Sequence, residues 1–177
     1  MLTSIGNCHR KLKTFANGIV LFELALRKEP NNFYAIFGLA DCYRGLSQQE
    51  RSLFFWNRIL EQDPRNKVIL TRGGDAYRCM GEYEKAQDYY ERALNIEFDT
   101  YAVLGLAMIS KDQGKFDEAA TSLKRLMQQD AKNYRIFLEL ANCYVKMGER
   151  RQAIAVLEEF QKLGIRNSHI SEMLEKI

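Results

Sequence analysis

Apolar side chains recur along the chain every three or four residues, and short polar or glycine-containing segments interrupt them. This spacing places the apolar residues on one face of a helix. One stripe in the middle of the chain consists of Tyr83, Ala86, Tyr90 and Ala93. A second helical stretch precedes Gly81, and glycine takes the left-handed conformation that ends a helix at little cost. The pattern predicts two amphipathic helices that meet at a tight turn.

Small residues in these two helices predict that they pack closely. Gly74 in the first helix and Ala86 in the second leave room for the approach, and Tyr77 and Tyr90 are expected to fill the space around them. One such pair cannot bury its whole apolar face. It therefore needs neighbouring pairs against which to stack.

The same layout recurs every 33 or 34 residues through the 177-residue chain. We therefore predict units at about residues 1–32, 33–66, 67–99, 100–133 and 134–167, and a terminal helix at about residues 168–177. The terminal helix either covers the fifth unit or begins a sixth. We expect residues 1–177 to form a single repeat domain. Since the first helix begins almost at Met1, we expect this domain to belong to a longer protein.

The boundaries between units carry signals that stop one helix and begin the next. Residues 29–32, Glu-Pro-Asn-Asn, combine a helix stop with a helix cap. The second unit departs from the pattern at its internal turn. There, Ser47 and Glu50 have the spacing of a capping box, in which the two side chains satisfy backbone donors at a helix start.

These residues resemble the tetratricopeptide repeat family. The third unit matches best, through Gly74, Tyr77, Gly81, Tyr83, Ala86, Tyr90 and Ala93. A single match would be weak evidence, but five copies at a constant period identify the pattern. The resemblance implies an all-α fold, a right-handed superhelical solenoid of antiparallel helix pairs. It also implies that the first helix of each pair lines a concave groove for a peptide or helix of a partner protein.

Helical spacing on the open face of each first helix predicts the side chains that line this groove. The candidates are Tyr34, Phe37, Asp41, Arg72, Asp75, Tyr101, Leu104, Met108, Arg135, Leu138, Glu139 and Asn142. Several are apolar where a solvated face would be polar, which favours a binding surface. The alternative is that these residues are partly buried between neighbouring helices. Gly38 and Gly105 are expected to leave room for a ligand.

Some members of the family bind the C-terminal carboxylate of heat-shock chaperones through lysine, asparagine and arginine on successive first helices. The matching places in the first three units hold Thr3, Asn7, Gly38, Val68 and Arg72. Only Asn7 and Arg72 agree with that pattern. In the last three units, Asp75 and Glu139 would repel a carboxylate. The sequence therefore disfavours a chaperone tail as the partner.

Apolar pairs on two of the second helices indicate a further contact surface. Val20-Leu21 and Phe54-Phe55 occupy corresponding places in the first two units, and the third unit has Asp88-Tyr89 there. Stacking should leave at least one member of each pair near solvent. Phe54 and Phe55 are thus candidates for contact with a missing segment, a second copy or a partner. Packing within the array is the alternative.

Composition and charge fit this picture and exclude several classes of function. The chain is 46% hydrophobic and 28% charged, and its 2 prolines suit a helical protein. No apolar run approaches the roughly 18 residues that a membrane span needs. The net charge of +3 arises in residues 1–66, with nine Lys/Arg against six Asp/Glu. It is too small to imply nucleic acid.

No catalytic or metal-binding constellation is apparent. Cys8, Cys42 and Cys143 fall at the same place in their units, where we expect small buried side chains. His9 and His169 lie near opposite ends of the chain. We therefore expect no cofactor and no enzymatic activity. Four cysteines without a disulfide pattern favour a reducing compartment, and so a cytoplasmic location.

The sequence thus predicts a protein-interaction module or scaffold. Self-assembly through Phe54 and Phe55 is the first alternative. A helical-repeat RNA binder is the second, but Asp41, Asp75 and Glu139 on the groove argue against it.

Overall fold

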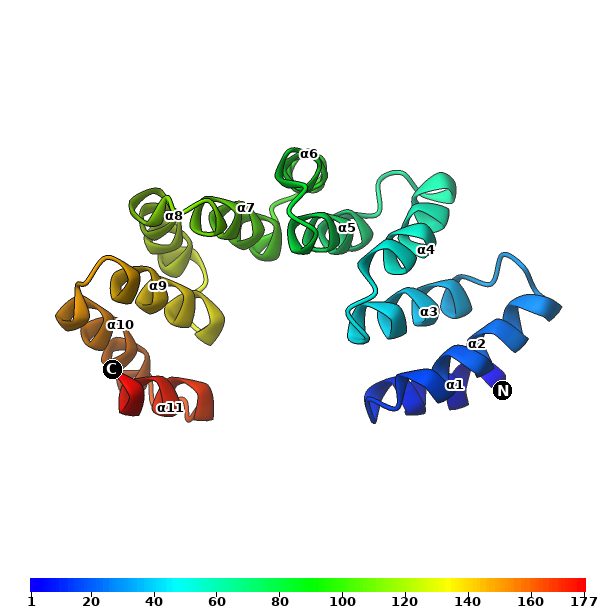
Figure 1. Cartoon of the computed structure of the whole chain (residues 1–177), viewed down its shortest axis with the longest axis horizontal. Helices are drawn as coiled ribbons and strands as arrows, with labels where there is room; N and C mark the ends of the chain where they lie inside the picture. Colours follow the sequence, from blue (N-terminus) through cyan, green and yellow to red (C-terminus); the bar gives the residue numbers. More distant parts are fainter. The chain divides into compact units, whose positions relative to one another are not determined.

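The computed structural model describes residues 1–177, which form eleven α-helices and no β-strand (Figure 1). The predicted all-α repeat fold is confirmed, with five helix pairs and a terminal helix. The helices are α1 (Leu2–Lys11), α2 (Phe15–Lys28), α3 (Phe33–Gly45), α4 (Gln49–Gln62), α5 (Lys67–Cys79), α6 (Tyr83–Leu94), α7 (Thr100–Asp112), α8 (Phe116–Gln129), α9 (Tyr134–Lys146), α10 (Arg150–Lys162) and α11 (Ser168–Lys176). None of these helices has the length and apolar character required to cross a membrane.

The chain divides into two compact units, Met1–Phe98 and Asp99–Ile177, which are called unit 1 and unit 2 below, whereas the repeats predicted from the sequence are called helix pairs. In unit 1, helices pack in sequence order, α1 on α2, α3 on α4 and α5 on α6, with α2 on α3 and α4 on α5 linking the pairs. In unit 2, α8 packs on both α7 and α9, and α9 packs on α10. The single domain expected from the sequence stays a prediction.

Left-handed residues make the turns inside the helix pairs. Gly81, Gly114 and Gly148 have φ values of 79°, 79° and 80°, which confirms the prediction for Gly81. The first two pairs place Lys13 (φ 59°) and Ser47 (φ 58°) there instead. The predicted capping box of Ser47 is wrong. Gln48 is the N-cap residue of α4 and has no side-chain cap bond, because Ser47 is used in the left-handed turn that follows α3.

Replacing Ser47 with glycine should raise the free energy of unfolding by about 0.5–1 kcal/mol. The left-handed conformation costs serine more than glycine, and this gain exceeds the entropy that glycine adds to the unfolded chain. Urea unfolding followed by fluorescence of Trp56 measures the change. The matched control is Gly81→Ala, which should lower the free energy of unfolding by about 1 kcal/mol. This loss should come from the left-handed backbone alone, because no atom lies within 4 Å of the added methyl group. Equal stability of Ser47→Gly and the parent protein would contradict the prediction.

Side-chain caps start the first helix of the second and every later pair. The Asn32 side chain accepts a hydrogen bond from the amide of Ala35 at 3.0 Å, which confirms the predicted cap. Equivalent caps at the starts of α5, α7, α9 and α11 are Asn66, Asp99, Asn133 and Asn167. Each cap satisfies backbone donors that the first turn of a helix leaves unpaired.

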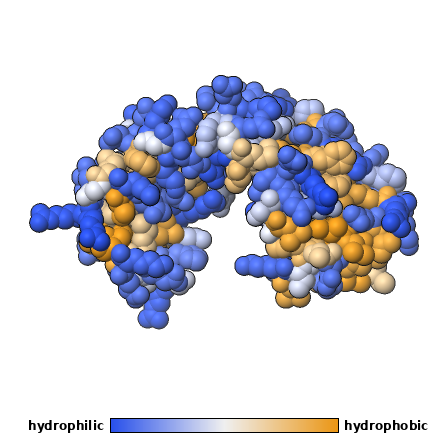
Figure 2. Space-filling model, viewed as in Figure 1, coloured by the Kyte–Doolittle hydropathy of each residue, from blue (hydrophilic) through white to orange (hydrophobic).

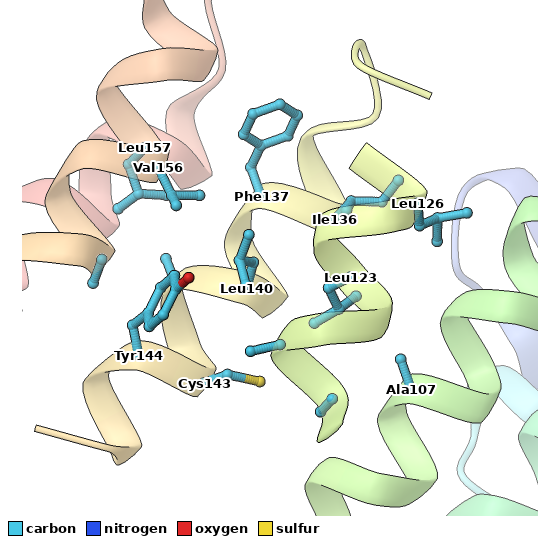
Figure 3. Close-up of a cluster of buried hydrophobic side chains, with 14 of the residues drawn as sticks. Ala107, Leu123, Leu126, Ile136, Phe137, Leu140, Cys143, Tyr144, Val156 and Leu157 are labelled. Atoms are coloured by element: carbon cyan, nitrogen blue, oxygen red, sulfur yellow. The ribbon is translucent and has the colours of Figure 1, made fainter. Parts of the chain in front are cut away.

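Unit 2 is built around one apolar core drawn from all of its helices (Figure 3). Leu123 of α8, Leu140 of α9 and Leu157 of α10 are fully buried in it. Phe137 and Phe160 meet edge to face, with ring centroids 5.1 Å apart. Helix α11 buries Ile170 against this core and contacts both α9 and α10. Helix α11 thus covers the fifth helix pair, which is one of the two alternatives that the sequence left open. The first helix of a sixth pair would make the same contacts, so the other alternative stands as well.

The core of unit 1 contains a phenylalanine ring packed against two glycines. The ring of Phe22, on α2, lies against Gly6 of α1 and Gly38 of α3, and a methyl group on Gly38 would fall 2.2 Å from it. The expectation that Gly38 leaves room for a ligand is therefore wrong, because Phe22 fills that space. Gly105 in unit 2 is likewise buried.

The third helix pair packs as its sequence predicts. The ring of Tyr90 lies against Gly74, where an added methyl group would sit 2.6 Å from it. Ala86 and Tyr90 are both fully buried. The neighbouring Gly73 is covered in the same way by the ring of Tyr89. Small residues on α5 thus let the large aromatic side chains of α6 approach its backbone.

Candidate functional site

The predicted groove residues of unit 1 differ in how far solvent reaches them. Tyr34 is 68% exposed near the start of α3. Phe37, Arg72 and Asp75 are half-buried. Asp41 is only 3% exposed, so the expectation that its side chain lines an open groove is wrong. The helices of unit 1 enclose this carboxylate, and three arginine side chains cover it.

These arginines surround Asp41 from three helices. Nη1 of Arg10, on α1, lies 2.7 Å from Oδ2 of Asp41. Nη1 of Arg72, on α5, lies 2.6 Å from Oδ1, and Nη2 of Arg44, on α3 itself, lies 3.2 Å from the same oxygen. We call Arg10, Arg44 and Arg72 the arginine cluster. A buried carboxylate requires this kind of pairing, because an unpaired charge in the interior is strongly unfavourable.

Aromatic rings hold one member of the cluster in place. The guanidinium carbon of Arg72 lies 5.2 Å from the ring centroid of Phe37 and 5.6 Å from that of Trp56, distances at which cation–π attraction operates. Burial lowers the pKa of Arg72, Asp41 opposes that shift, and the nearby Arg44 and Arg10 add to it. Arg72 is thus fixed in position and experiences repulsion from other positive charges.

A buried tyrosine anchors the other acidic residue on this face. The hydroxyl of Tyr90 donates a hydrogen bond to Oδ1 of Asp75 at 2.7 Å. Burial, followed by the negative charge of Asp75, raises the pKa of Tyr90 far above its usual value. Tyr90 therefore stays a neutral donor, and Asp75 is held by the packing of the third helix pair.

The predicted groove residues of unit 2 also separate into exposed and buried groups. Tyr101 is 56% exposed, and Arg135 and Asn142 are exposed. Leu138 and Glu139 are half-buried, and Glu139 accepts a hydrogen bond from Lys111 at 2.5 Å.

The prediction that Leu104 and Met108 line an open surface is wrong. Both residues are buried in the core of unit 2. They belong to α7, and their side chains pack in the cluster formed with α8 and α9. This packing leaves α7 only a narrow face open to solvent.

One position is exposed in four of the first helices. It is the second residue of each helix, and it is Tyr34, Val68, Tyr101 and Arg135 in α3, α5, α7 and α9. Three of them, Tyr34, Tyr101 and Arg135, were predicted on the open face of their helices. Their exposure, within each unit, supports the register from which the groove was predicted.

The arginine cluster itself was not predicted, although the sequence carries a signal for two of its members, Arg10 and Arg44. Arg10, Arg44 and Arg78 recur 34 residues apart, which places a basic side chain at one repeat position in three successive first helices. Comparison of equivalent repeat positions would have revealed the recurrence.

Apolar side chains also reach solvent on the second helices of unit 1. Phe54 is exposed, whereas Phe55 stacks on Tyr43 with ring centroids 5.7 Å apart. Val20 is exposed at the corresponding place in α2. Figure 2 shows apolar surface gathered over the part of unit 1 formed by α1 and α2. One member of each apolar pair therefore lies near solvent, as the sequence predicts, and a role in binding stays a prediction.

The cysteines divide into two buried and two exposed thiols. Cys42 and Cys143 are buried as expected, but the expectation is wrong for Cys8, which is exposed, as is Cys79. The packing of α1 on α2 and α3 leaves the side of α1 that carries Cys8 open. Burial raises the pKa of the Cys42 thiol to about 11, with a smaller opposing effect of Arg10.

A maleimide should therefore label Cys8 and Cys79 rapidly in the folded protein and leave Cys42 and Cys143 unmodified. The thiolate is the reactive form, and burial both excludes the reagent and disfavours the thiolate. Intact mass and peptide mapping count and place the adducts. Labelling in denaturant should reach all four thiols, and rapid native labelling of Cys42 would contradict the burial described above.

The structure contains no group of three or more His, Cys, Asp and Glu side chains that could hold a metal ion.

Sequence models described as tetratricopeptide repeat match residues 111–162 and 71–100. No curated protein sequence gave a significant match.

Solved structures resemble the chain over nearly its whole length. A tetratricopeptide repeat protein from Parabacteroides merdae is 22% identical with a TM-score of 0.85, and the match covers 96% of this chain and 66% of that one. A thermophilic repeat protein of Thermus thermophilus is 20% identical with a TM-score of 0.81, over 99% and 96% of the two chains. PilW, described as a type IV pilus biogenesis factor, is 20% identical with a TM-score of 0.79, over 96% and 79%. At these identities, the similarity establishes the fold.

Proposed function

Since the chain is a tetratricopeptide repeat protein, we propose that it is a non-enzymatic interaction module that binds a segment of a partner protein on its first helices. The candidate binding residues lie on the open faces of α3 and α5 in unit 1 and, as a separate set, on those of α7 and α9 in unit 2. We place this activity in the cytoplasm, where the four unpaired cysteines suit a reducing environment.

The recurrent exposed position on the first helices carries the proposal. Tyr34 and Tyr101 present large aromatic side chains to solvent at 68% and 56% exposure. Aromatic residues dominate the binding energy of protein interfaces because they bury a large area with few rotatable bonds. Val68 and Arg135 occupy the same repeat position, and both are exposed. Each unit thus presents two exposed side chains at this repeat position, Tyr34 and Val68 in unit 1 and Tyr101 and Arg135 in unit 2, which suits contact with an extended or helical segment.

Selection from a displayed peptide library on the immobilised full chain tests the proposal. The selected peptides should lose about tenfold or more in affinity for Tyr34→Ala or Tyr101→Ala, as expected for an aromatic anchor. Phe54→Ala is the matched control, because it removes an exposed ring from a second helix. Peptides that bind both tyrosine variants as well as the parent chain would exclude the first helices as the binding surface.

The exposed ring of Phe54 favours self-assembly as a second candidate function. Phe54 meets Phe55 edge to face at 5.1 Å, so the two rings present one apolar projection on α4. A homo-oligomer formed through this surface would dissociate in Phe54→Ser. Sedimentation equilibrium over a range of concentrations distinguishes the candidates, since a monomer throughout would exclude self-assembly.

A further inference from the structure

The arginine cluster of unit 1 carries more positive charge than the carboxylate at its centre neutralises. Three guanidinium groups share the single carboxylate of Asp41, with nitrogen–oxygen distances of 2.7, 2.6 and 3.2 Å. One further acid, Asp75, and one further base, Arg78, lie close by. Four positive and two negative groups leave the face with an excess of positive charge.

The cluster remains accessible although its carboxylate is buried. The side chains of Arg10, Arg72 and Arg44 are 26%, 30% and 46% exposed, compared with 2% for that of Asp41. Each guanidinium has five N–H donors, and the contacts to Asp41 use only part of them. Donors therefore remain for a second anion on the solvent side of the cluster.

An aromatic surface on α3 adjoins the cluster. Arg72 covers Phe37, the ring of Phe37 lies 6.0 Å from that of Phe33, and Phe33 lies 5.7 Å from Tyr34. Phe33 and Tyr34 are both exposed. We call Phe33, Tyr34 and Phe37 the aromatic shelf. A ligand that reaches Arg72 with a negative group can therefore place an apolar group on the shelf.

We propose that the arginine cluster binds an acidic segment of a partner protein, with its carboxylates on Arg10, Arg44 and Arg72 and an apolar side chain on the aromatic shelf. The proposal rests on the interaction function proposed above and names the chemistry of the partner. Guanidinium and carboxylate groups form paired hydrogen bonds that are stronger than neutral ones. A bound carboxylate would also offset the repulsion among the three guanidinium groups.

Two features favour a peptide over a nucleic acid. A phosphate backbone needs positive charge along its whole length, whereas the face beside the cluster presents Asp75 as well as Arg72. The cluster is also compact, with one buried acid joining its three arginines. A short peptide segment in which an acidic residue stands next to an apolar one suits so compact a cluster and the aromatic shelf beside it.

Fluorescence anisotropy on the full chain tests the proposal with a short labelled peptide that is rich in glutamate, contains one leucine and has an amidated C-terminus. We expect its affinity to be at least about tenfold higher than that of the same peptide with glutamine in place of glutamate. The affinity should fall as the salt concentration rises. The amide separates this mode from recognition of a terminal carboxylate. Equal binding of the two peptides would overturn the proposal.

Variants of single charges separate a binding role from a structural one. Arg44→Gln should lower the affinity for the acidic peptide about fivefold or more. Arg27→Gln, which removes the same charge from an exposed site on α2, should leave affinity within about twofold. Asp41→Asn should strengthen binding about threefold, because it removes the competing carboxylate. Loss of binding in Asp41→Asn with unchanged helical content would overturn the proposal.

Two further outcomes would show which part of the proposal is wrong. If the glutamine peptide binds equally well and remains sensitive to Tyr34→Ala, the acidic preference is wrong and the interaction surface stands. If a single-stranded oligouridylate binds more tightly than the acidic peptide and loses affinity in Arg44→Gln, the cluster serves nucleic acid and the proposal is overturned.

Discussion

Replacing Phe22 with alanine is expected to lower the free energy of unfolding of unit 1 by about 3–5 kcal/mol. The ring is fully buried and lies against the backbone at Gly6 and Gly38. Neither glycine has a side chain that could move into the vacated space. The cavity would therefore persist, and the loss should fall toward the upper end of the range for a buried phenylalanine.

Urea unfolding followed by tryptophan fluorescence measures this loss in unit 1, because Trp56 is the only tryptophan in the chain. Leu24→Ala is the matched control on the same helix. Leu24 is partly exposed, so its truncation should cost about 1 kcal/mol or less. A loss below about 1 kcal/mol for Phe22→Ala would show that α1 and α3 close the cavity.

Gly38→Ala should destabilise unit 1 by about 1–3 kcal/mol, although alanine favours helices more than glycine by about 1 kcal/mol. The added methyl group would lie 2.2 Å from the Phe22 ring. The ring cannot retreat toward α1, because it already lies within 2.9 Å of the place where a methyl group on Gly6 would be. Overpacking should thus outweigh the gain in helix propensity.

A double-mutant cycle isolates this contact. Phe22→Leu shortens the side chain next to Gly38, so the double variant Gly38→Ala with Phe22→Leu should be more stable than the sum of the two single losses predicts. Coupling between residues in contact amounts to about 0.5–3 kcal/mol. Strict additivity of the two substitutions would contradict the packing of Phe22 on Gly38.

The fold could be predicted because its determinants are local and repeated. The apolar spacing within Tyr83–Ala93 places one stripe on a helix, and the left-handed Gly81 marks where the preceding helix stops. The apolar spacing recurs in every pair, and a left-handed glycine recurs in the fourth and fifth pairs. Errors arose where a turn used a different residue, as at Ser47, because a left-handed serine cannot be distinguished from a helix cap by its spacing alone.

The site could be predicted only in part, because helical spacing gives a direction but not what lies in that direction. Tyr34, Tyr101 and Asn142 are exposed as expected. Leu104 and Met108 point into the core of unit 2, where α8 and α9 enclose them. A single-helix pattern contains no information about how much of its open face neighbouring helices cover.

The arginine cluster was missed for a related reason. Asp41 meets Arg10 and Arg72 across 31 residues in each direction. These pairings arise from three different first helices, so no pattern within one helix reveals them. Alignment of equivalent positions between helix pairs relates Arg10 to Arg44, but Arg72 has Gly38 at its equivalent place, so that alignment does not reveal its part in the cluster.

The side-chain caps have a consequence for how such a chain can change in length. Asn32 and Asn66 bond to amides within the helix that each begins, as do Asp99, Asn133 and Asn167. A stretch taken from one cap to the residue before the next therefore carries its own start signal and its own turn. Duplication or deletion between two caps would join complete modules, so these five positions are natural junctions for recombination and for the design of longer or shorter arrays.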